Sequence, residues 1–400
     1  MGLTIGEKIL AQHLGRDVSP GEIVEVDVDL AMSHDNAALV IRQFSKIGID
    51  CVWDPERIVI ILDHRAPSES IKTSVGHQSI RRFVHEQKIR NFFDIGYGIC
   101  HQVLIEEGFS KPGNILVGTD SHTTSHGAVG AFATGIGATD MAGVWATGRI
   151  WFRVPSTIRI EISGRFDRRV VAKDLILSII GEVGADGAQY KAVEFSGPLI
   201  DSLALSPRIT ICNLSMEMGA KVAIVDDGNI PPDKDAQYED TLRFDASTLP
   251  PQVACPHQVD RVKPITEVAG IPIDQAVIGS CTNGRLDDLK QAWEILQQAE
   301  VARGVRLIVV PASRKIYLEA AKLGIISGIM ERGGVVINPG CGPCLGAHQG
   351  ILAPKERCIA TTNRNFKGRM GSPEAEVYLA SPYTVAASAL TGKITDPRRL

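Results

Sequence analysis

Short apolar runs rich in β-branched residues alternate with helical patterns along most of this chain. Such runs predict buried strands at residues 57–62, 114–117, 275–279, 306–310, 334–337 and 358–360. Helical patterns follow at residues 286–299 and 313–323, and residues 210–213 continue into a helical stretch through residue 218. Strands that alternate with helices form parallel sheets with helices packed on them. The sequence therefore predicts an α/β protein with doubly wound parallel sheets.

Two breaks in this alternation suggest domain boundaries. One lies near Pro155, and the other is the polar, Pro-rich stretch at residues 228–263. A chain of 400 residues is long enough for two or three domains. We expect three α/β domains, at residues 1–155, 156–265 and 266–400.

Composition indicates a globular protein of the cytoplasm. Charged residues make up 22% of the chain, and 42 Lys and Arg against 46 Asp and Glu leave a net charge of −4, which does not favour nucleic acid or an anionic membrane as partner. Thr4 and Glu7 form a capping-box pattern, so the N-terminus predicts a helix rather than a signal peptide. No apolar run approaches the ~20 residues of a membrane helix. Eight scattered cysteines do not form a disulfide scaffold.

Three cysteines stand apart from the others by their surroundings. Cys281 lies in GSCTNG at residues 279–284, and Cys341 and Cys344 lie in NPGCGPCLG at residues 338–346. Iron–sulfur clusters that carry electrons usually take four protein ligands. Three ligands leave one metal position open, where a substrate oxygen can bind. The spacing therefore predicts a cluster that takes part in chemistry.

The Cys341–Cys344 pair has two other interpretations. CGPC is also the sequence of a redox dithiol, although the preceding Pro339 and Gly340 predict a loop rather than a helix start. A zinc site would need a fourth ligand, for which His348 is the local candidate. The remaining cysteines are expected to be buried small apolar residues, at positions 51, 100, 212, 255 and 358.

Two motifs place a carboxylate beside an imidazole directly after a predicted strand. They are Asp63-His64 and Asp120-Ser121-His122. In open α/β sheets ligands bind beyond the carboxyl ends of strands. The three cysteines and residues 363–369 also follow predicted strands, so they share this location with the two motifs. Histidine moves protons near neutral pH, and aspartate fixes its charge or tautomer. Adjacent residues do not face one another on a strand, so we expect each pairing to be completed across the site. The alternative is a hydrogen-bonded turn.

Residues 363–369, NRNFKGR, contain two arginines and two asparagines. Arginine binds carboxylates through two parallel hydrogen bonds, so Arg364 and Arg369 indicate a substrate with more than one carboxylate, unless they form a solvated turn. Asn363 and Asn365 could hydrogen-bond cluster sulfurs.

With these motifs in order, the sequence resembles the aconitase superfamily along nearly its whole length, and within it the branch of isopropylmalate dehydratases and homoaconitases. The resemblance rests on DH at 63–64, GICHQ at 98–102, GTDSHT at 118–123, ICNLSMEMGA at 211–220, GSCTN at 279–283, NPGCGPC at 338–344 and NRNF at 363–366.

The resemblance implies an aconitase-like arrangement of three α/β domains around a central cluster cleft. It also implies a four-iron, four-sulfur cluster held by Cys281, Cys341 and Cys344, with one iron left without a protein ligand. Active-site acids and bases would be Asp63, His64, Asp120, His122 and Glu217. Substrate would be bound by His34, His101, Ser121, Arg364 and Arg369, and the cluster or its ligands by Asn213 and Asn363. A histidine at position 34 favours the isopropylmalate branch.

The activity that the resemblance implies is a hydro-lyase reaction that isomerises 2- and 3-isopropylmalate by dehydration and rehydration, in leucine biosynthesis. Homoaconitate hydratase and dehydratases of methylated malates are the alternatives within the family. The swivelling fourth domain of full-length aconitases has no counterpart here, so a separate small subunit is expected to complete the site, and the single chain to turn over little. Alternatives outside this class are RNA binding after loss of the cluster and a thiol–disulfide oxidoreductase.

Overall fold

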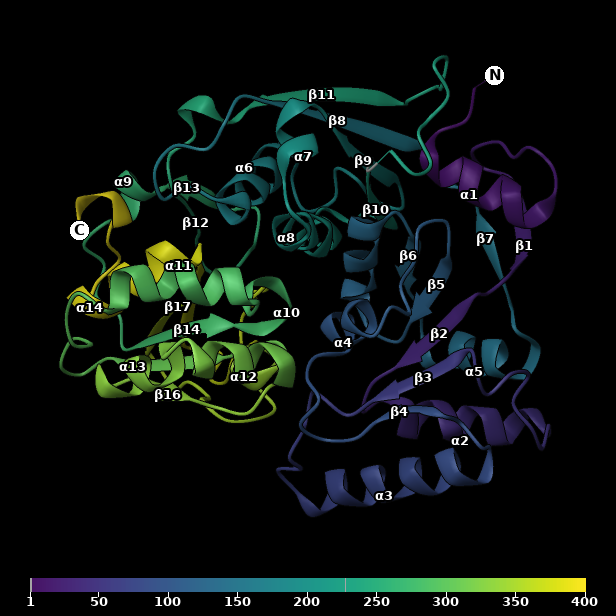
Figure 1. Ribbon diagram of the computed structural model, residues 1–400, viewed down its shortest axis with the longest axis horizontal. Helices are drawn as coiled ribbons and strands as arrows, with labels where there is room; N and C mark the ends of the chain where they lie inside the picture. The colour runs from purple at the N-terminus through teal and green to yellow at the C-terminus, as the bar shows by residue number, and fades with distance from the viewer. Residues whose placement is uncertain (1, 227) are drawn as a thin grey trace.

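The computed structural model describes residues 2–226 and 228–400, and three parallel or largely parallel sheets organise them (Figure 1). The first sheet has the order β4-β3-β2-β5-β6, with every neighbouring pair parallel. Its strands are β2 (Leu30–Ser33), β3 (Ile58–Ile61), β4 (Asn91–Phe93), β5 (Ile115–Gly118) and β6 (Phe132–Gly135). The helices of this part are α1 (Ile5–Leu14), α2 (Ala37–Ile47), α3 (Ile71–Glu86), α4 (Cys100–Glu106) and α5 (Ala138–Thr147). An antiparallel pair, β1 (Ile23–Asp27) and β7 (Arg149–Arg153), lies beside it.

Strand β3 explains why this sheet is covered on both faces. All four of its residues are buried. Ile58 and Ile60 pack in the hydrophobic cluster that contains α2, α3 and α5, whereas Val59 and Ile61 pack in the one that contains α4. Alternate strand residues point to opposite faces, so a continuous apolar run matches a sheet buried on both sides.

The second sheet has the order β10-β9-β8-β11, again all parallel. It comprises β8 (Thr157–Ser163), β9 (Ala192–Ser196), β10 (Val222–Val225) and β11 (Asp240–Asp245), with helices α6 (Ala172–Val183), α7 (Pro198–Ser202) and α8 (Leu205–Ser215). A short 3-10 helix, η2 (Met216–Met218), follows α8 and leads to β10.

The third sheet has the order β13-β12-β18-β17-β14-β15-β16, and the strands from β18 to β16 are parallel. Its strands are β12 (Gln252–Ala254), β13 (Val262–Pro264), β14 (Gln275–Gly279), β15 (Arg306–Val310), β16 (Val335–Val336), β17 (Arg357–Ala360) and β18 (Glu376–Leu379). Its helices are α9 (Ile265–Val268), α10 (Ser280–Asn283), α11 (Leu286–Leu296), α12 (Arg314–Lys322), α13 (Ile325–Glu331) and α14 (Pro382–Thr391).

The elements expected from the sequence are present. The strands expected around residues 58–61, 115–118, 275–279, 306–310, 335–336 and 357–360 are confirmed, as is the capping box of Thr4 and Glu7. The helical stretch expected from residue 210 to residue 218 is confirmed: it comprises α8, which starts earlier, at Leu205, and η2. Every residue from Ile209 to Ser215 is buried.

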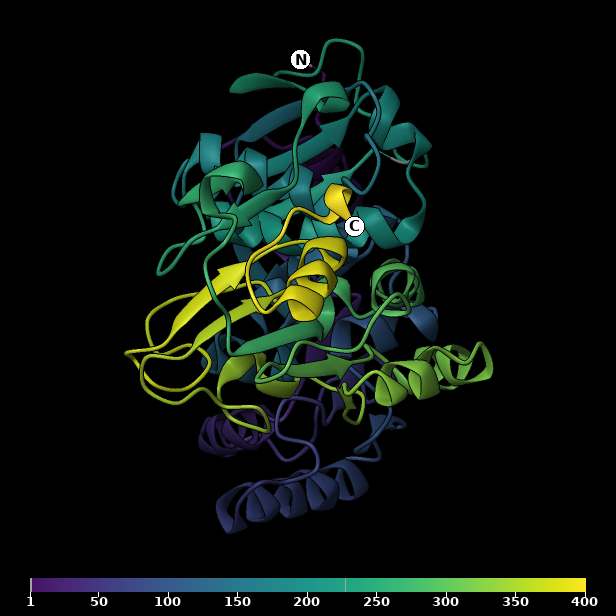
Figure 2. The ribbon, with the colours of Figure 1, turned by 90° about the vertical axis from the view of Figure 1, so that its left-hand side faces the viewer.

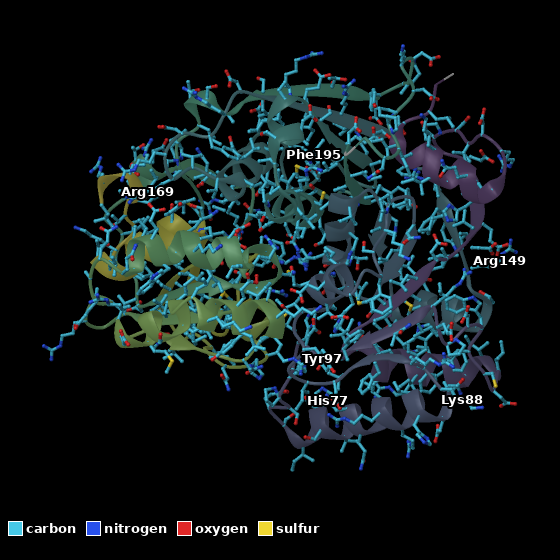
Figure 3. All side chains as sticks on the ribbon, viewed as in Figure 1. His77, Lys88, Tyr97, Arg149, Arg169 and Phe195 are labelled. Carbon is cyan, nitrogen blue, oxygen red and sulfur yellow. The ribbon has the colours of Figure 1, made fainter. Side chains whose placement is uncertain are left out.

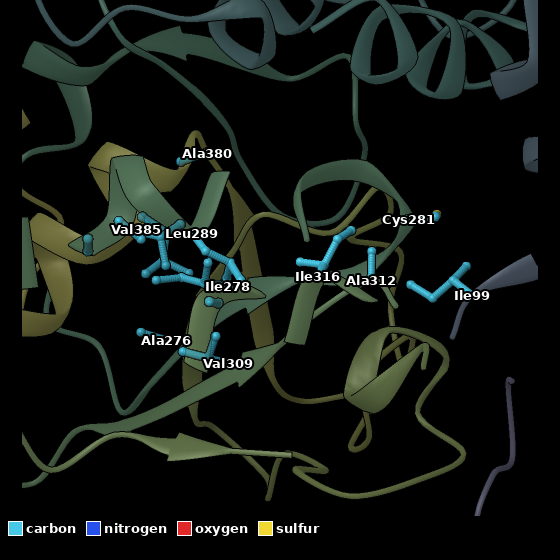
Figure 4. Packing of buried hydrophobic residues seen from close by; sticks show 14 of the residues in the cluster. Ile99, Ala276, Ile278, Cys281, Leu289, Val309, Ala312, Ile316, Ala380 and Val385 are labelled. Carbon is cyan, nitrogen blue, oxygen red and sulfur yellow. The ribbon is translucent and has the colours of Figure 1, made fainter. Parts of the chain in front are cut away.

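The sheets meet in the middle of the molecule. Figure 2 places α2 and α3 at the lower end, the second sheet at the upper end, and strands of the third sheet with α14 toward the viewer. Figure 4 shows Ile99, which precedes α4, beside Cys281 of α10 at one end of a hydrophobic cluster whose other end holds Ala276 and Val385. The carboxyl ends of the first and third sheets' strands therefore converge. The expected domain boundaries at residues 155 and 265 stay predictions.

Within the described residues, no helix has the length and apolarity needed to cross a membrane.

Candidate functional site

A small cavity lies where loops that follow strands of the first and third sheets meet. Its walls are His64, Ile99, His101, Asp120, His122, Cys281, Cys341, Cys344, Leu345, Asn363 and Arg369. All of these except Ile99 and Leu345 are residues for which the sequence predicted a role in one site. Segments that are far apart in the chain are thus brought to one place by the strand ends.

The three predicted cysteine ligands share this cavity and are buried. Cys281 starts from a sharp turn after β14, where Gly279 has φ 138° and Ser280 has φ 69°; a side chain at Gly279 would collide with the Val310 carbonyl. Burial raises the pKa of the Cys281 thiol well above its usual value and that of Cys341 to about 12. Such thiols remain protonated in a metal-free protein and are ionised by a bound metal.

Two asparagine side chains point at the sulfur of Cys281. Asn213 Nδ2 lies 3.3 Å and Asn363 Nδ2 3.2 Å from Cys281 Sγ, and Asn363 Oδ1 is 3.4 Å from Cys344 Sγ. Amide N–H groups that donate to sulfur stabilise thiolate. Asn365 instead donates to the carbonyl of Cys255, at 2.8 Å, so the expectation that it reaches cluster sulfurs is wrong.

The alternatives for the cysteine pair fit this geometry less well. His348, the proposed zinc ligand, is partly buried but lies outside the cavity with the cysteines, and its Nε2 is 3.1 Å from the carbonyl oxygen of Pro67. A redox dithiol needs only two thiols, so it does not account for Cys281 as a third thiol in the same cavity. Among the other cysteines, three are buried as expected, whereas Cys51 is exposed and Cys255 only partly buried.

The Asp63-His64 pair forms a direct contact, contrary to the expectation that neighbours cannot face each other. His64 Nδ1 is 2.7 Å from Asp63 Oδ1, and its Nε2 is 3.4 Å from Asp120 Oδ2. Both residues of the pair lie beyond the end of β3, where the alternation of a strand no longer applies. Burial is the largest single influence and opposes a charge on His64, but the Asp63 carboxylate, an ionised Cys341 and the hydrogen bond to Asp120 together raise the pKa of His64 well above its ordinary value. These partners favour the protonated form of His64, which can donate a proton.

Asp120 is the centre of a histidine cluster. Its Oδ1 is 2.9 Å from His101 Nε2, 3.3 Å from His122 Nδ1 and 2.8 Å from the His122 backbone nitrogen. Burial alone would raise the pKa of Asp120, but hydrogen bonds from His101 and His122 hold it well below its ordinary range. The carboxylate stays ionised and fixes the rings around it.

The second sheet contributes Glu217, from η2. Glu217 Oε1 lies 2.9 Å from His122 Nε2 and 2.8 Å from Arg364 Nε. Burial would raise the pKa of Glu217, yet the His122 hydrogen bond and the Arg364 charge lower it. Glu217 thus joins the histidine cluster to the arginine segment that follows β17.

The remaining predicted residues surround this network. The ring of His34 stacks on that of His64 with centroids 4.0 Å apart, and burial together with the charge of His64 lowers its pKa. Arg369 Nη2 is 4.0 Å from Cys344 Sγ. Ser121 lines a neighbouring cavity of about 530 Å³ rather than the cavity with the cysteines. Every predicted site residue therefore lines one of these two cavities or is joined to them by the contacts described above.

Asp35 has a part in the site that the sequence reasoning missed. Its Oδ2 accepts the backbone N–H groups of Asp63 (3.0 Å) and His64 (2.7 Å), and its Oδ1 that of Arg65 (3.2 Å). His77, labelled in Figure 3, reaches from α3 to the same Oδ1 at 2.8 Å. Asp35 follows the end of β2, so the strand-end rule could have found it.

The loop with the acid–base pair is also bonded to the loop with the cysteines. The backbone N–H of Cys341 donates to the carbonyl of Asp63 at 3.1 Å. Asn338 Nδ2 donates to the carbonyl of Ala66 at 2.8 Å. Two loops that follow strands of different sheets are thus held together by hydrogen bonds.

A buried trio of thiols beside a histidine–carboxylate network defines a class: metal-dependent enzymes that move protons. The aconitase family (aconitate hydratase) matches residues 7–230 and 262–392, and the chain belongs to this family of hydro-lyases. The α/β architecture with aconitase-like sheets is thereby confirmed. A crystal structure of aconitase X in its holo-form from Thermococcus kodakaraensis covers 93% of both chains with a TM-score of 0.53 at 12% identity, which is a likeness of fold.

Relatives in sequence cover the full length of the chain. The 3-isopropylmalate dehydratase large subunit 1 of Methanopyrus kandleri is 50% identical over 100% of this chain and 99% of its own. A probable 3-isopropylmalate dehydratase large subunit of Methanothermobacter thermautotrophicus is 51% identical, over 100% of each chain. A probable methanogen homoaconitase large subunit of the same organism is 51% identical over 99% of this chain and 98% of its own.

Family membership implies an iron–sulfur cluster, and the residues present fit one. Three buried cysteines line one cavity, and two amide N–H groups point at the sulfur of Cys281. Thiolate ligands with N–H donors to sulfur are what such clusters require.

Proposed function

We propose that this chain is the large subunit of a 3-isopropylmalate dehydratase, which interconverts 2- and 3-isopropylmalate by dehydration and rehydration in leucine biosynthesis. The observation that carries the proposal is the full-length identity of about half to relatives of that name, and the cavity that gathers the three cysteines with His64, Asp120 and Arg369 supports it. Homoaconitate hydratase is the second candidate, because a homoaconitase relative is equally similar. Dehydratases of methylated malates are the third.

The cofactor in this proposal is a four-iron, four-sulfur cluster on Cys281, Cys341 and Cys344, with one iron free of protein ligands. Bound there, it would supply a Lewis acid for the substrate hydroxyl and a carboxylate. Asn213 and Asn363 would stabilise the Cys281 thiolate through their N–H donors.

The chain's own side chains would handle protons and carboxylates. Asp63 holds Nδ1 of His64 at 2.7 Å, so the proton on Nε2 is the one available to a departing hydroxyl. Asp120 keeps this histidine charged, which suits a general acid.

Arg364 and Arg369 would bind the substrate's carboxylates and keep the unsaturated intermediate in place between elimination and re-addition. Glu217 holds Arg364 at 2.8 Å and His122 at 2.9 Å, and His101 is held by Asp120. His34 and Ser121 would line the substrate space beside them.

A separate small subunit completes the proposed enzyme. The C–H proton of a malate needs a strong, well-placed base, and the family pattern assigns that base to the small subunit. We therefore propose that this chain is active only in the heteromer, in the cytoplasm, with its domains at residues 1–155, 156–265 and 266–400.

The test is an anaerobic assay of the reconstituted chain with and without the small subunit encoded in the same organism. Isopropylmalate, homocitrate and 2,3-dimethylmalate are compared by the absorbance of the unsaturated product. The proposal expects the highest kcat/KM for isopropylmalate and turnover only with both subunits. Preference for homocitrate would establish the homoaconitase alternative, and full turnover by the single chain would refute the need for a partner.

A further inference from the structure

Lys173, in the first turn of α6, is a fully buried lysine close to the cluster cysteines. Its relative exposure is 0%, and Nζ donates to the carbonyl oxygens of Thr361 at 2.9 Å and Thr362 at 2.7 Å. The next residue, Asn363, contacts the sulfurs of Cys281 and Cys344. Lys173 thus lies directly behind the segment that faces the cavity.

This ammonium group has no carboxylate partner of its own. Among the ion pairs of the described residues, none includes Lys173, and both oxygens of the adjacent Asp174 accept backbone N–H groups, from Gln252 (2.9 Å) and Val171 (3.0 Å). Asp288, another buried acid, is engaged by Arg285 and Asn283. A buried charge without a partner destabilises a protein.

The position of Lys173 in the helix adds to this destabilisation. A cation in the first turn of a helix lies at the positive end of the helix dipole. Burial lowers the pKa of Lys173 to about 7, whereas the ionised forms of Cys281 and Cys344 act in the opposite direction. The carboxylates of Asp288 and Asp174 act in the same direction, but the groups with the largest compensating effect on the ammonium are the cluster cysteines, once they are thiolates.

We propose that Lys173 is the buried counter-charge of the cluster: its ammonium group stabilises the thiolate-bound centre and, through the Thr361 and Thr362 carbonyls, positions Asn363. This inference rests on the cluster of the proposed function. A nearby cation stabilises the more negative, reduced form of a centre more than the oxidised form, and so raises the reduction potential. Lys173 is a positioning residue, since it touches neither substrate nor the cysteine sulfurs.

Two variants separate charge from tethering. Lys173→Gln removes the charge but keeps an N–H donor for the two carbonyls, and Lys173→Met removes both. Lys221→Met is the matched control, because Lys221 is a second lysine whose pKa is lowered by burial, and it contacts the rings of Phe152 and Tyr190 rather than the cysteines.

Each chain is measured as apo-protein and after anaerobic reconstitution with ferrous iron and sulfide. The readouts are the rise in Tm on cluster binding and the reduction potential, from a dye-mediated titration followed by electron paramagnetic resonance. Both Lys173 variants should show a smaller rise in Tm than the wild type and a lower potential. A tenfold weaker preference for the reduced form corresponds to about 59 mV for one electron. Lys221→Met should change neither quantity.

Three outcomes would overturn the inference. One is a Lys173→Gln chain with the wild-type potential and the wild-type rise in Tm, which leaves Lys173 as a tether only. Another is a Lys221→Met control whose reduction potential and rise in Tm change as much as those of the Lys173 variants. The third is failure of both Lys173 variants to fold as apo-protein, which would assign the lysine a structural role. A wild-type chain that binds no cluster would instead refute the proposed function, so the two failures are distinguishable.

Discussion

The substitution Asp35→Asn tests how the acid–base loop is held. Asp35 accepts three backbone N–H groups from residues 63–65 and the His77 ring. In the variant one oxygen becomes an NH₂ group, which leaves the Arg65 N–H without an acceptor and removes the charge from the other bonds. A hydrogen bond to a charged group contributes about 1.5–3 kcal/mol. We therefore expect the loop to lose about 2 kcal/mol of local stability.

Amide hydrogen exchange of the peptide that covers residues 63–70 measures this quantity directly. A loss of about 2 kcal/mol raises the opening equilibrium roughly 30-fold, since 1.36 kcal/mol corresponds to a factor of ten. Exchange in α11, in the third sheet's part of the chain, should stay unchanged. The kcat/KM of the complete enzyme should fall at least about tenfold, because displacement of His64 disturbs the geometry for proton transfer.

Asp94→Asn is the matched control. Asp94 also accepts a backbone N–H, from Ile95 at 2.7 Å, and pairs with Arg81, but its side chain is 37% exposed. Exposed pairs contribute about 0–1 kcal/mol, so exchange at residues 63–70 should not respond. Equal exchange of this peptide in Asp35→Asn and wild type would refute the reasoning, because the carboxylate would then not be what holds the loop.

Three further outcomes follow from the site and the core. Cys281→Ser should abolish cluster formation, seen as loss of iron and sulfide in chemical analysis, whereas Cys358→Ser, at a buried cysteine outside the cavity, should retain the wild-type iron content. Glu217→Gln should lower kcat roughly 100-fold with an unchanged circular dichroism spectrum, because the charge that orients His122 and Arg364 is lost. A decrease in kcat of less than about threefold would contradict this role. Burial raises the pKa of Glu194 to about 7 from 4.5, so its contribution to stability is full below pH 4.5 and is lost as pH rises to 7, by about 1.36 kcal/mol per pH unit. The Tm of the Glu194→Gln variant minus the Tm of the wild type should therefore increase between pH 5 and pH 8. A Tm difference that stays constant over this range would show that the Glu194 carboxyl does not titrate in this way.

The sequence was a good guide wherever function depends on strand ends. Asp63, Asp120, Cys281 and Asn363 each follow an apolar run that is recognisable as a strand, and parallel strands bring their carboxyl ends to one edge. Local sequence patterns therefore predicted which residues, far apart in the chain, lie close together in the site, without any information on contacts.

The misses came from features that packing decides. Asp63 and His64 pair directly because the strand ends before them, and the position of a strand's last residue is the least certain part of a prediction. Lys173 is unremarkable in sequence, because its burial depends on how α6 packs against the third sheet.

The bonds between residues 63–66 and the Asn338–Cys341 segment couple two parts of the site that come from different sheets. Both bonds end on backbone carbonyl groups, so a shift of the cysteine loop would be transmitted to the backbone that carries His64, and the reverse holds as well. The proton donor and the thiols therefore share one frame. A substitution that displaces either loop would alter proton transfer and metal binding together.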